Sequence, residues 1–96
     1  MQTHKLKTDP APFADVWLGT KKAELRVNDR DYKIGDRLEL QEQNIAHVVA
    51  INHQITAKPT GRVVVVVVSH IVEEGYGLRA GYVMLSFSPI DKRDDN

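Results

Sequence analysis

The sequence predicts a small α+β domain, mainly β, in which five to six short strands curl into a mixed β-barrel with one short helix near the start. Three observations predict this fold. Apolar residues recur at helical spacing within segment 9–19, their period changes to two from residue 24, and Val63–Val68 form an unbroken apolar run. Because the chain has only 96 residues, we expect a single domain over residues 1–90 and a disordered tail over residues 91–96.

The helix is expected to begin at Pro10 and to end before Gly19. Asp9 suits the N-cap, and proline suits the first helical position because no intrahelical bond is lost there. Glycine favours the left-handed conformation in which many helices terminate. One apolar face is formed by Phe13, Val16 and Trp17, so this face is expected to pack on the core.

Strands are predicted over residues 24–28, 37–41, 45–51, 62–71 and 82–87. Leu25 and Val27 alternate with polar residues, which indicates a half-buried strand. Val63–Val68 are apolar on both faces, which indicates a central strand buried on both sides, and His70 at its end is expected near the core. Turns are predicted over residues 28–31, 33–36 and 59–61.

Composition excludes several classes of function. The 13 basic residues balance the 13 acidic ones, so any nucleic-acid contact is expected to be a local patch, unlike the broad basic surface that grips duplex DNA. Without cysteine there is no thiolate zinc site, and the four histidines lack metal-ligand spacing, so we expect no metal and no cofactor. No apolar run approaches the length of a membrane span, and residues 1–7 lack the apolar stretch of a signal peptide. We therefore expect a cytoplasmic protein without membrane contact, and a monomer.

The segment Gly19–Arg26 reads G-x-K-x-x-E-x-R and lies between the predicted helix and a strand, with Gly35-Asp36 opening the next strand. Together with residues 4–7, 28–31 and 75–83, this arrangement resembles the ASCH domain, a PUA-like β-barrel family linked to RNA. It is similar to a small branch found in bacteria and their phages, and the resemblance spans residues 3–88. It implies a PUA-like barrel that binds single-stranded RNA, a nucleoside or a nucleotide in a pocket beside the motif.

The resemblance places Lys21, Glu24 and Arg26 at the centre of that pocket. Lysine and arginine can meet phosphate, and a carboxylate can accept hydrogen bonds from a base amino group. Two simpler interpretations remain open: Glu24 and Arg26 share a strand face and can pair with each other, and Lys21 and Lys22 follow a helix C-terminus, where cations are favoured. We expect Lys21→Ala or Arg26→Ala to weaken RNA binding with little loss of stability.

Further ligand-binding candidates flank this centre. Arg30 adds positive charge, and Tyr32 and Tyr76 are candidate stacking surfaces for bases because they lie in predicted loops. By resemblance to the family, His4 and Lys7 can also reach the cleft.

Two alternative functions use the same residues differently. The first is a small hydrolase, either a ribonuclease or an amidohydrolase of acylated nucleosides, with Lys21 and Glu24 as catalytic residues. Resemblance to the amidohydrolase branch implies Glu73 or Glu74 as the acidic partner in that reaction. In the amidohydrolase branch of the superfamily, a threonine stands where this chain has Glu24. The second is a protein-interaction module with a vestigial cleft, in which an enlarged hairpin over residues 43–61 contacts the partner.

Overall fold

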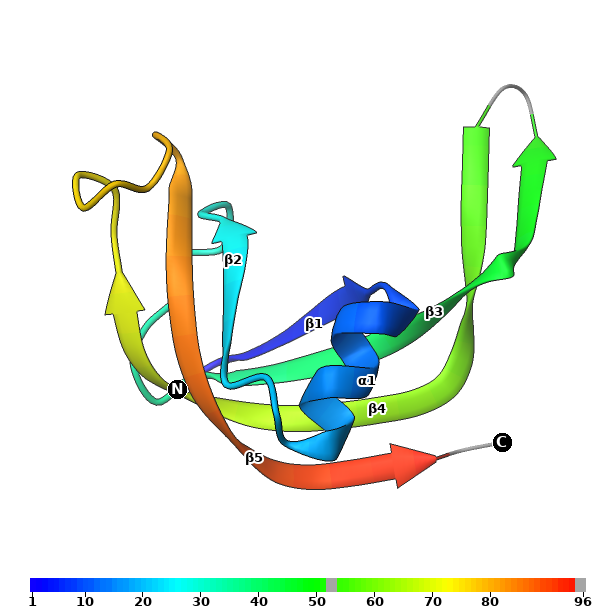
Figure 1. Ribbon diagram of the computed structural model, residues 1–96, viewed down its shortest axis with the longest axis horizontal. Coiled ribbons are helices and arrows are strands. Elements are labelled where there is room, and N and C mark those ends of the chain that lie inside the picture. Colours follow the sequence, from blue (N-terminus) through cyan, green and yellow to red (C-terminus); the bar gives the residue numbers. More distant parts are fainter. Residues whose placement is uncertain (52–53, 95–96) are drawn as a thin grey trace.

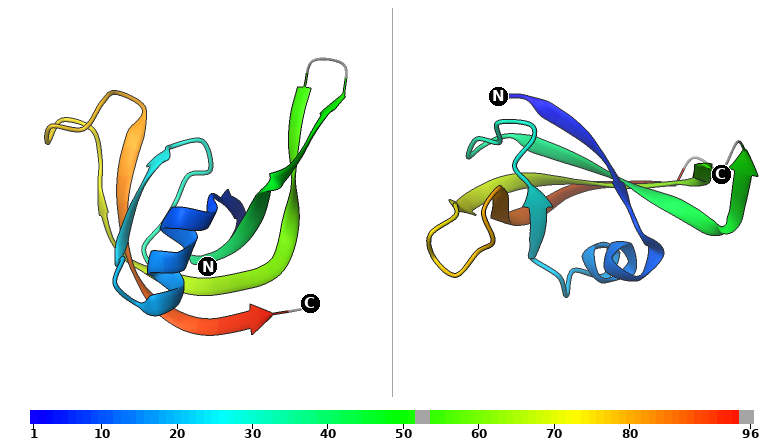
Figure 2. Two further views of the ribbon diagram at one scale, coloured as in Figure 1. Left: turned by 45° about the vertical axis from the view of Figure 1, so that its right-hand side comes forward. Right: turned by 90° about the horizontal axis from the view of Figure 1, so that it is seen from above.

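The computed structural model describes residues 1–51 and 54–94, with the backbone alone for residues 45–51 and 54–56 (Figure 1). One helix and five strands follow one another in this order: β1 (Thr3–Thr8), α1 (Pro10–Leu18), β2 (Ala23–Val27), β3 (Arg37–Ile51), β4 (Gln54–Val72) and β5 (Tyr82–Asp94). The strands form one mixed sheet in the order β1-β3-β4-β5-β2, in which β1 and β3 are parallel and the other pairs antiparallel. The sheet curls into a half-barrel, and α1 lies in its trough (Figures 1 and 2). The predicted fold class is therefore confirmed.

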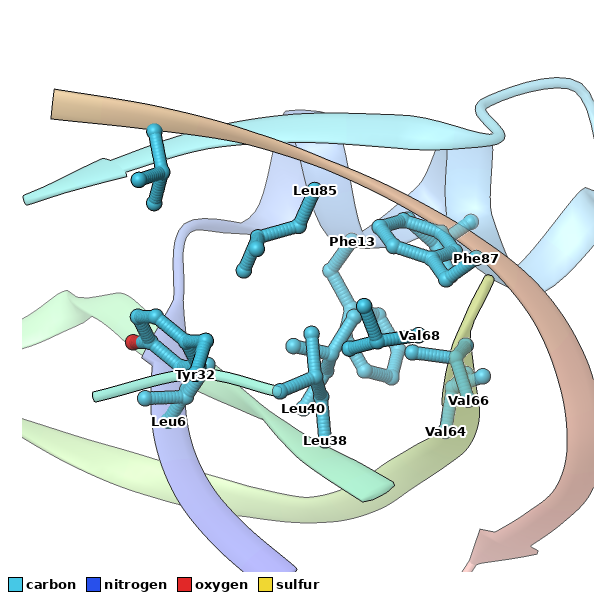
Figure 3. Packing of buried hydrophobic residues seen from close by; sticks show 12 residues of the cluster. Leu6, Phe13, Tyr32, Leu38, Leu40, Val64, Val66, Val68, Leu85 and Phe87 are labelled. Carbon is cyan, nitrogen blue, oxygen red and sulfur yellow. The ribbon is translucent and has the colours of Figure 1, made fainter. Parts of the chain in front are cut away.

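The core fills the concave side of the sheet (Figure 3). Alternate valines of β4 point into it and meet side chains from the neighbouring strands and from the helix. The cluster contains Leu6, Phe13, Val16, Tyr32, Leu38, Leu40, Val64, Val66, Val68, Val83, Leu85 and Phe87. Complete burial of a side chain such as Phe13 contributes about 2–3 kcal/mol.

The helix has the predicted limits. Pro10 lies in its first turn, and Gly19 follows its last residue with a φ of 84°, a left-handed conformation that costs glycine little. Phe13 and Val16 are buried, and Trp17 packs against the core while carrying the guanidinium of Arg62 over its ring, 4.4 Å from the ring centre.

The valine strand differs from the prediction on its outer face. Val64, Val66 and Val68 are fully buried. On the other face Val65 is also buried, at 7% exposure, whereas Val63 and Val67 are only partly buried. His70 lies beyond the core and is exposed, so the prediction of a near-core histidine is wrong.

The hairpin of β3 and β4 is longer than an ordinary one and projects from the body (Figure 2). The two strands pair as far as Ile51 and Gln54, which confirms the strand predicted over residues 45–51 and the enlarged hairpin over residues 43–61. Residues 59–61 do not form a turn. They lie within β4, where the pairing register with β3 shifts between the pairs Gln41–Val63 and Gln43–Pro59. Residues 60–62 of β4 are opposite Glu42 alone, so the segment predicted as a turn forms an irregularity within the strand.

The predicted disordered tail over residues 91–96 is wrong for residues 91–94. There β5 continues beside Arg62–Val65 of β4, and Arg93 pairs with Glu39. Residues 95–96 lie outside the described residues. Within the described part of the chain, α1 is too short to cross a membrane, and no other helix is present.

Candidate ligand-binding site

A cleft opens where the two free edges of the curled sheet face each other. Strands β1 and β2 are the outermost strands of the sheet, and the opening is lined by residues 5–8 of β1 and by all of β2. We call this opening the edge cleft. It is lined by residues 5–9, 23–27, Pro12, Lys21, Asp29, Arg30, Tyr32, Gln41, Tyr82 and Met84.

Strand β2 is turned opposite to the usual orientation. In a half-buried strand the aliphatic residues face the core, yet here Glu24 is only 8% exposed while Leu25 and Val27 are 52% and 51% exposed. Alternation in the sequence fixes which residues share a face, and it leaves open which face points inward. Glu24 and Arg26 therefore point into the cleft, and Leu25 and Val27 remain exposed to solvent on the other face of the strand.

Arg26 spans the cleft from one edge of the sheet to the other. Its Nε donates to Glu24 Oε2 at 2.6 Å, and its Nη2 donates to the carbonyl of Lys7 at 3.2 Å and to Thr8 Oγ1 at 3.3 Å. The predicted sharing of a strand face by Glu24 and Arg26 is confirmed, and so is the simpler interpretation that the two pair. Because Arg26 also reaches β1, the ion pair is part of a link between edges that no backbone hydrogen bonds connect.

The remaining charges of the edge cleft leave it locally basic. Five of its lining residues are lysine or arginine and three are aspartate or glutamate. Arg30 lies 3.8 Å from Asp29 on the exposed side. Among the described residues, no ion pair engages Lys7 or Lys21, so their ammonium groups are available to an anionic ligand.

Tyr32 reaches the cleft through its hydroxyl group. Tyr32 is 6% exposed, and its ring packs edge-on against the His4 imidazole with 4.9 Å between the ring centroids. The ring therefore offers no free face on which a base could stack. Figure 3 shows its oxygen pointing away from the other labelled core side chains. Burial, followed by the charge of Asp29, raises the pKa of this phenol, while Arg26 and Arg30 act in the opposite direction. Tyr32 is therefore a neutral hydrogen-bonding group.

Other sequence candidates lie away from the edge cleft. His4 is buried, with its Nε2 2.8 Å from Asp36 Oδ2. Tyr76 is 83% exposed on the loop between β4 and β5 and does not line the cleft. On the same loop, Glu74 accepts a hydrogen bond from the amide of Gly81, and Glu73 lies beside it at a separate small hollow. The structure therefore brings neither glutamate to Lys21.

Metal binding has no candidate among the described residues, since nowhere in them do three or more histidine, aspartate or glutamate side chains gather around a common point. His53 lies outside the described residues.

Several cleft residues were not site candidates in the sequence analysis, among them Lys5, Thr8, Gln41 and Tyr82. The first three lie on β1 and β3, which become walls of the cleft only through the parallel pairing of these strands. Tyr82 begins the last strand and borders the cleft because β5 pairs with β2. Nothing local in the sequence marks either pairing.

Comparison with known proteins gives a family without an assigned activity. Residues 3–87 match the model of a family described as "Domain of unknown function (DUF3850)". No curated protein matches the sequence.

Proposed function

The chain belongs to the DUF3850 family, and we propose that it is a binding module for single-stranded RNA or a nucleotide, with the edge cleft as its site. We further propose that it is an ASCH-like, PUA-like domain, on the strength of the G-x-K-x-x-E-x-R segment and the small mixed half-barrel that contains it.

The orientation of β2 carries this proposal. An inward-facing ion pair costs desolvation of both charges, and outward-facing Leu25 and Val27 lose the free energy that burial would provide. A strand selected only for stability would face the other way. The arrangement is understandable if Glu24 and Arg26 are held in the cleft for recognition.

The chemistry of the cleft suits a nucleotide. Lys7, Lys21 and Arg30 supply positive charge for phosphate at its rim. The second oxygen of Glu24, which has no hydrogen-bond partner among the described residues, can accept from an amino group of a base. The hydroxyls of Thr8 and Tyr32 add groups that both donate and accept. Local basicity on a chain of zero net charge favours a short single strand over a long duplex.

Titration with short single-stranded RNA and with free nucleotides tests the proposal. Amide shifts followed by NMR are expected at Lys21, Glu24 and Arg26. Lys21→Ala is expected to weaken RNA binding and to lower the slope of log K against log salt by roughly 0.7. Lys22→Ala is the matched control, because Lys22 is the next residue, is exposed and does not line the cleft.

Absence of binding to every probe, or equal losses in Lys21→Ala and Lys22→Ala, would contradict the proposal. Each mixture is also checked for product, because turnover of an acylated nucleoside or of RNA would make the chain a hydrolase.

A further inference from the structure

We infer that Tyr82 is the surface on which a base of the bound strand stacks, with Leu25, Val27 and Met84 completing an apolar shelf around it. The inference rests on the proposed function and adds to it the part of the site that holds the flat face of the base.

The pairing of β2 with β5 places these four side chains together. Val27 is the register partner of Tyr82, and Leu25 is the register partner of Met84. Partners across an antiparallel pair point to the same side of the sheet, as do residues two apart on one strand. The four therefore form a two-by-two patch on the face opposite Glu24, Arg26 and the buried Val83.

This shelf is continuous with the edge cleft. All four residues line the same opening as Lys21, Glu24 and Arg26, because β2 is an outermost strand and a ligand beside its free edge meets side chains from both of its faces. Leu25 and Val27 are half exposed there, because the polar residues of β2 occupy its inward face. The outward face therefore presents aliphatic surface that a ligand can cover.

The other tyrosines are less suitable for stacking at this site. The ring of Tyr32 is covered by the core and by His4, and Tyr76 projects from a loop that does not border the cleft. Tyr82 is partly exposed and borders the cleft, and its backbone amide donates to the carbonyl of Arg79 at 3.1 Å. An aromatic ring at this position offers a flat face on which any base can stack.

Charge favours a nucleic-acid base over an apolar protein segment as the occupant of the shelf. The cleft that adjoins it carries more basic than acidic side chains, and the basic ones include Lys7 and Lys21, which form no ion pair with any described residue. A strand with its phosphates at these lysines presents its bases toward the neighbouring shelf. An apolar protein partner would gain nothing from the lysines and would bury part of their charge.

The test compares two probes on the same set of variants. One probe is a short oligocytidylate, whose bases carry the amino group that Glu24 can accept from, and the other is a ribose-phosphate chain of equal length without bases. Tyr82→Ala is expected to lose at least about fivefold in affinity for the oligocytidylate and little for the chain without bases, because stacking on one aromatic ring contributes about that much. Tyr82→Phe keeps the ring and is expected to bind as the wild type does, and so is Tyr76→Ala, the control for an exposed tyrosine outside the cleft.

The outcomes separate this inference from the proposed function. If the wild type binds oligocytidylate and Tyr82→Ala binds it equally well, the shelf is wrong and the binding module stands. If Tyr82→Ala loses equal affinity for both probes, the tyrosine acts without stacking, which also overturns the inference. If Tyr82→Ala instead abolishes a concentration-dependent association of the wild type in sedimentation while RNA affinity is unchanged, the shelf is a protein contact. If the wild type binds neither probe, the proposed function fails together with the inference.

Discussion

His4 and Asp36 form a buried polar pair, with His4 Nε2 2.8 Å from Asp36 Oδ2. The backbone amides of Gln2 and Lys33 also donate to this carboxylate, each at 3.0 Å. Because an ionised carboxylate only accepts hydrogen bonds, the imidazole carries its proton on Nε2. The pair fastens the start of β1 to the turn before β3, and it thereby fixes one wall of the edge cleft.

Removing this carboxylate is expected to destabilise the fold. Asp36→Ala leaves two backbone amides and a buried imidazole without their acceptor, and we expect the free energy of unfolding to fall by about 2–4 kcal/mol. Urea denaturation measures this loss. Asp15→Ala is the control, since Asp15 is exposed on α1 and its side chain makes no ion pair or hydrogen bond among the described residues. A loss below about 0.5 kcal/mol for Asp36→Ala would contradict the proposed role of the pair.

Acid is expected to weaken the fold through two carboxylates. Burial alone would raise the pKa of Asp36, but its hydrogen bonds from His4, Gln2 and Lys33 outweigh burial and lower it; Arg93 lowers the pKa of Glu39. Unfolding returns both groups to higher pKa values, so the unfolded chain binds protons first as the pH falls. Their contribution to stability is therefore complete above the ordinary carboxyl pKa of about 4 and disappears as the pH falls through the lower folded values.

Denaturant titrations at a series of pH values from neutral to strongly acidic measure this dependence. Glu39→Gln is expected to weaken the pH dependence of the free energy of unfolding at acidic pH. If this dependence is the same in the variant and the wild type, the pair of Glu39 with Arg93 contributes nothing to it.

Arg26→Ala is expected to cost stability as well as binding, contrary to the expectation from the sequence. Glu24 is buried and has its only hydrogen bond from Arg26 among the described residues, so the variant leaves a carboxylate without its partner and also removes the link to β1. We expect a loss of about 1–3 kcal/mol in the free energy of unfolding.

Thermal and urea denaturation of three variants separates these effects. Lys21→Ala is expected to remain within about 0.5 kcal/mol of the wild type, because Lys21 makes no ion pair among the described residues. The double variant Glu24→Gln, Arg26→Ala is expected to recover part of the loss, since no unpaired charge remains. If Arg26→Ala alone is as stable as the wild type, the link between the edges is energetically unimportant.

Residues 91–94 are expected to contribute to folding. A chain that ends at residue 90 loses the strand that covers Arg62–Val65, the pair of Arg93 with Glu39 and the cation of Lys92 over the Trp17 ring. We expect a lower melting temperature by calorimetry and a change in the Trp17 fluorescence. A chain that ends at residue 94 is the control, and equal melting temperatures for the two chains would mean that this part of β5 adds no stability.

Local patterns in the sequence predicted the helix, most strands and the common face of Glu24 and Arg26, because these depend on short-range periodicity. They failed wherever a distant strand decides the outcome. Asp36 meets His4 across 32 positions of the chain, and the polar segment 91–94 becomes a strand because the valine strand offers it a free edge. Local periodicity also could not determine which face of β2 points inward, although that choice creates the candidate site.

The two walls of the edge cleft are formed by β1 and β2, which are close in the sequence but lie at opposite ends of the sheet. Strands β1 and β2 are separated along the chain mainly by α1, yet all three other strands lie between them in the sheet order. The width of the opening therefore depends on the curvature of every strand in between. A ligand that contacts both walls would close the ring of strands, so amide hydrogen exchange should slow across the whole sheet, including strands that the ligand never touches.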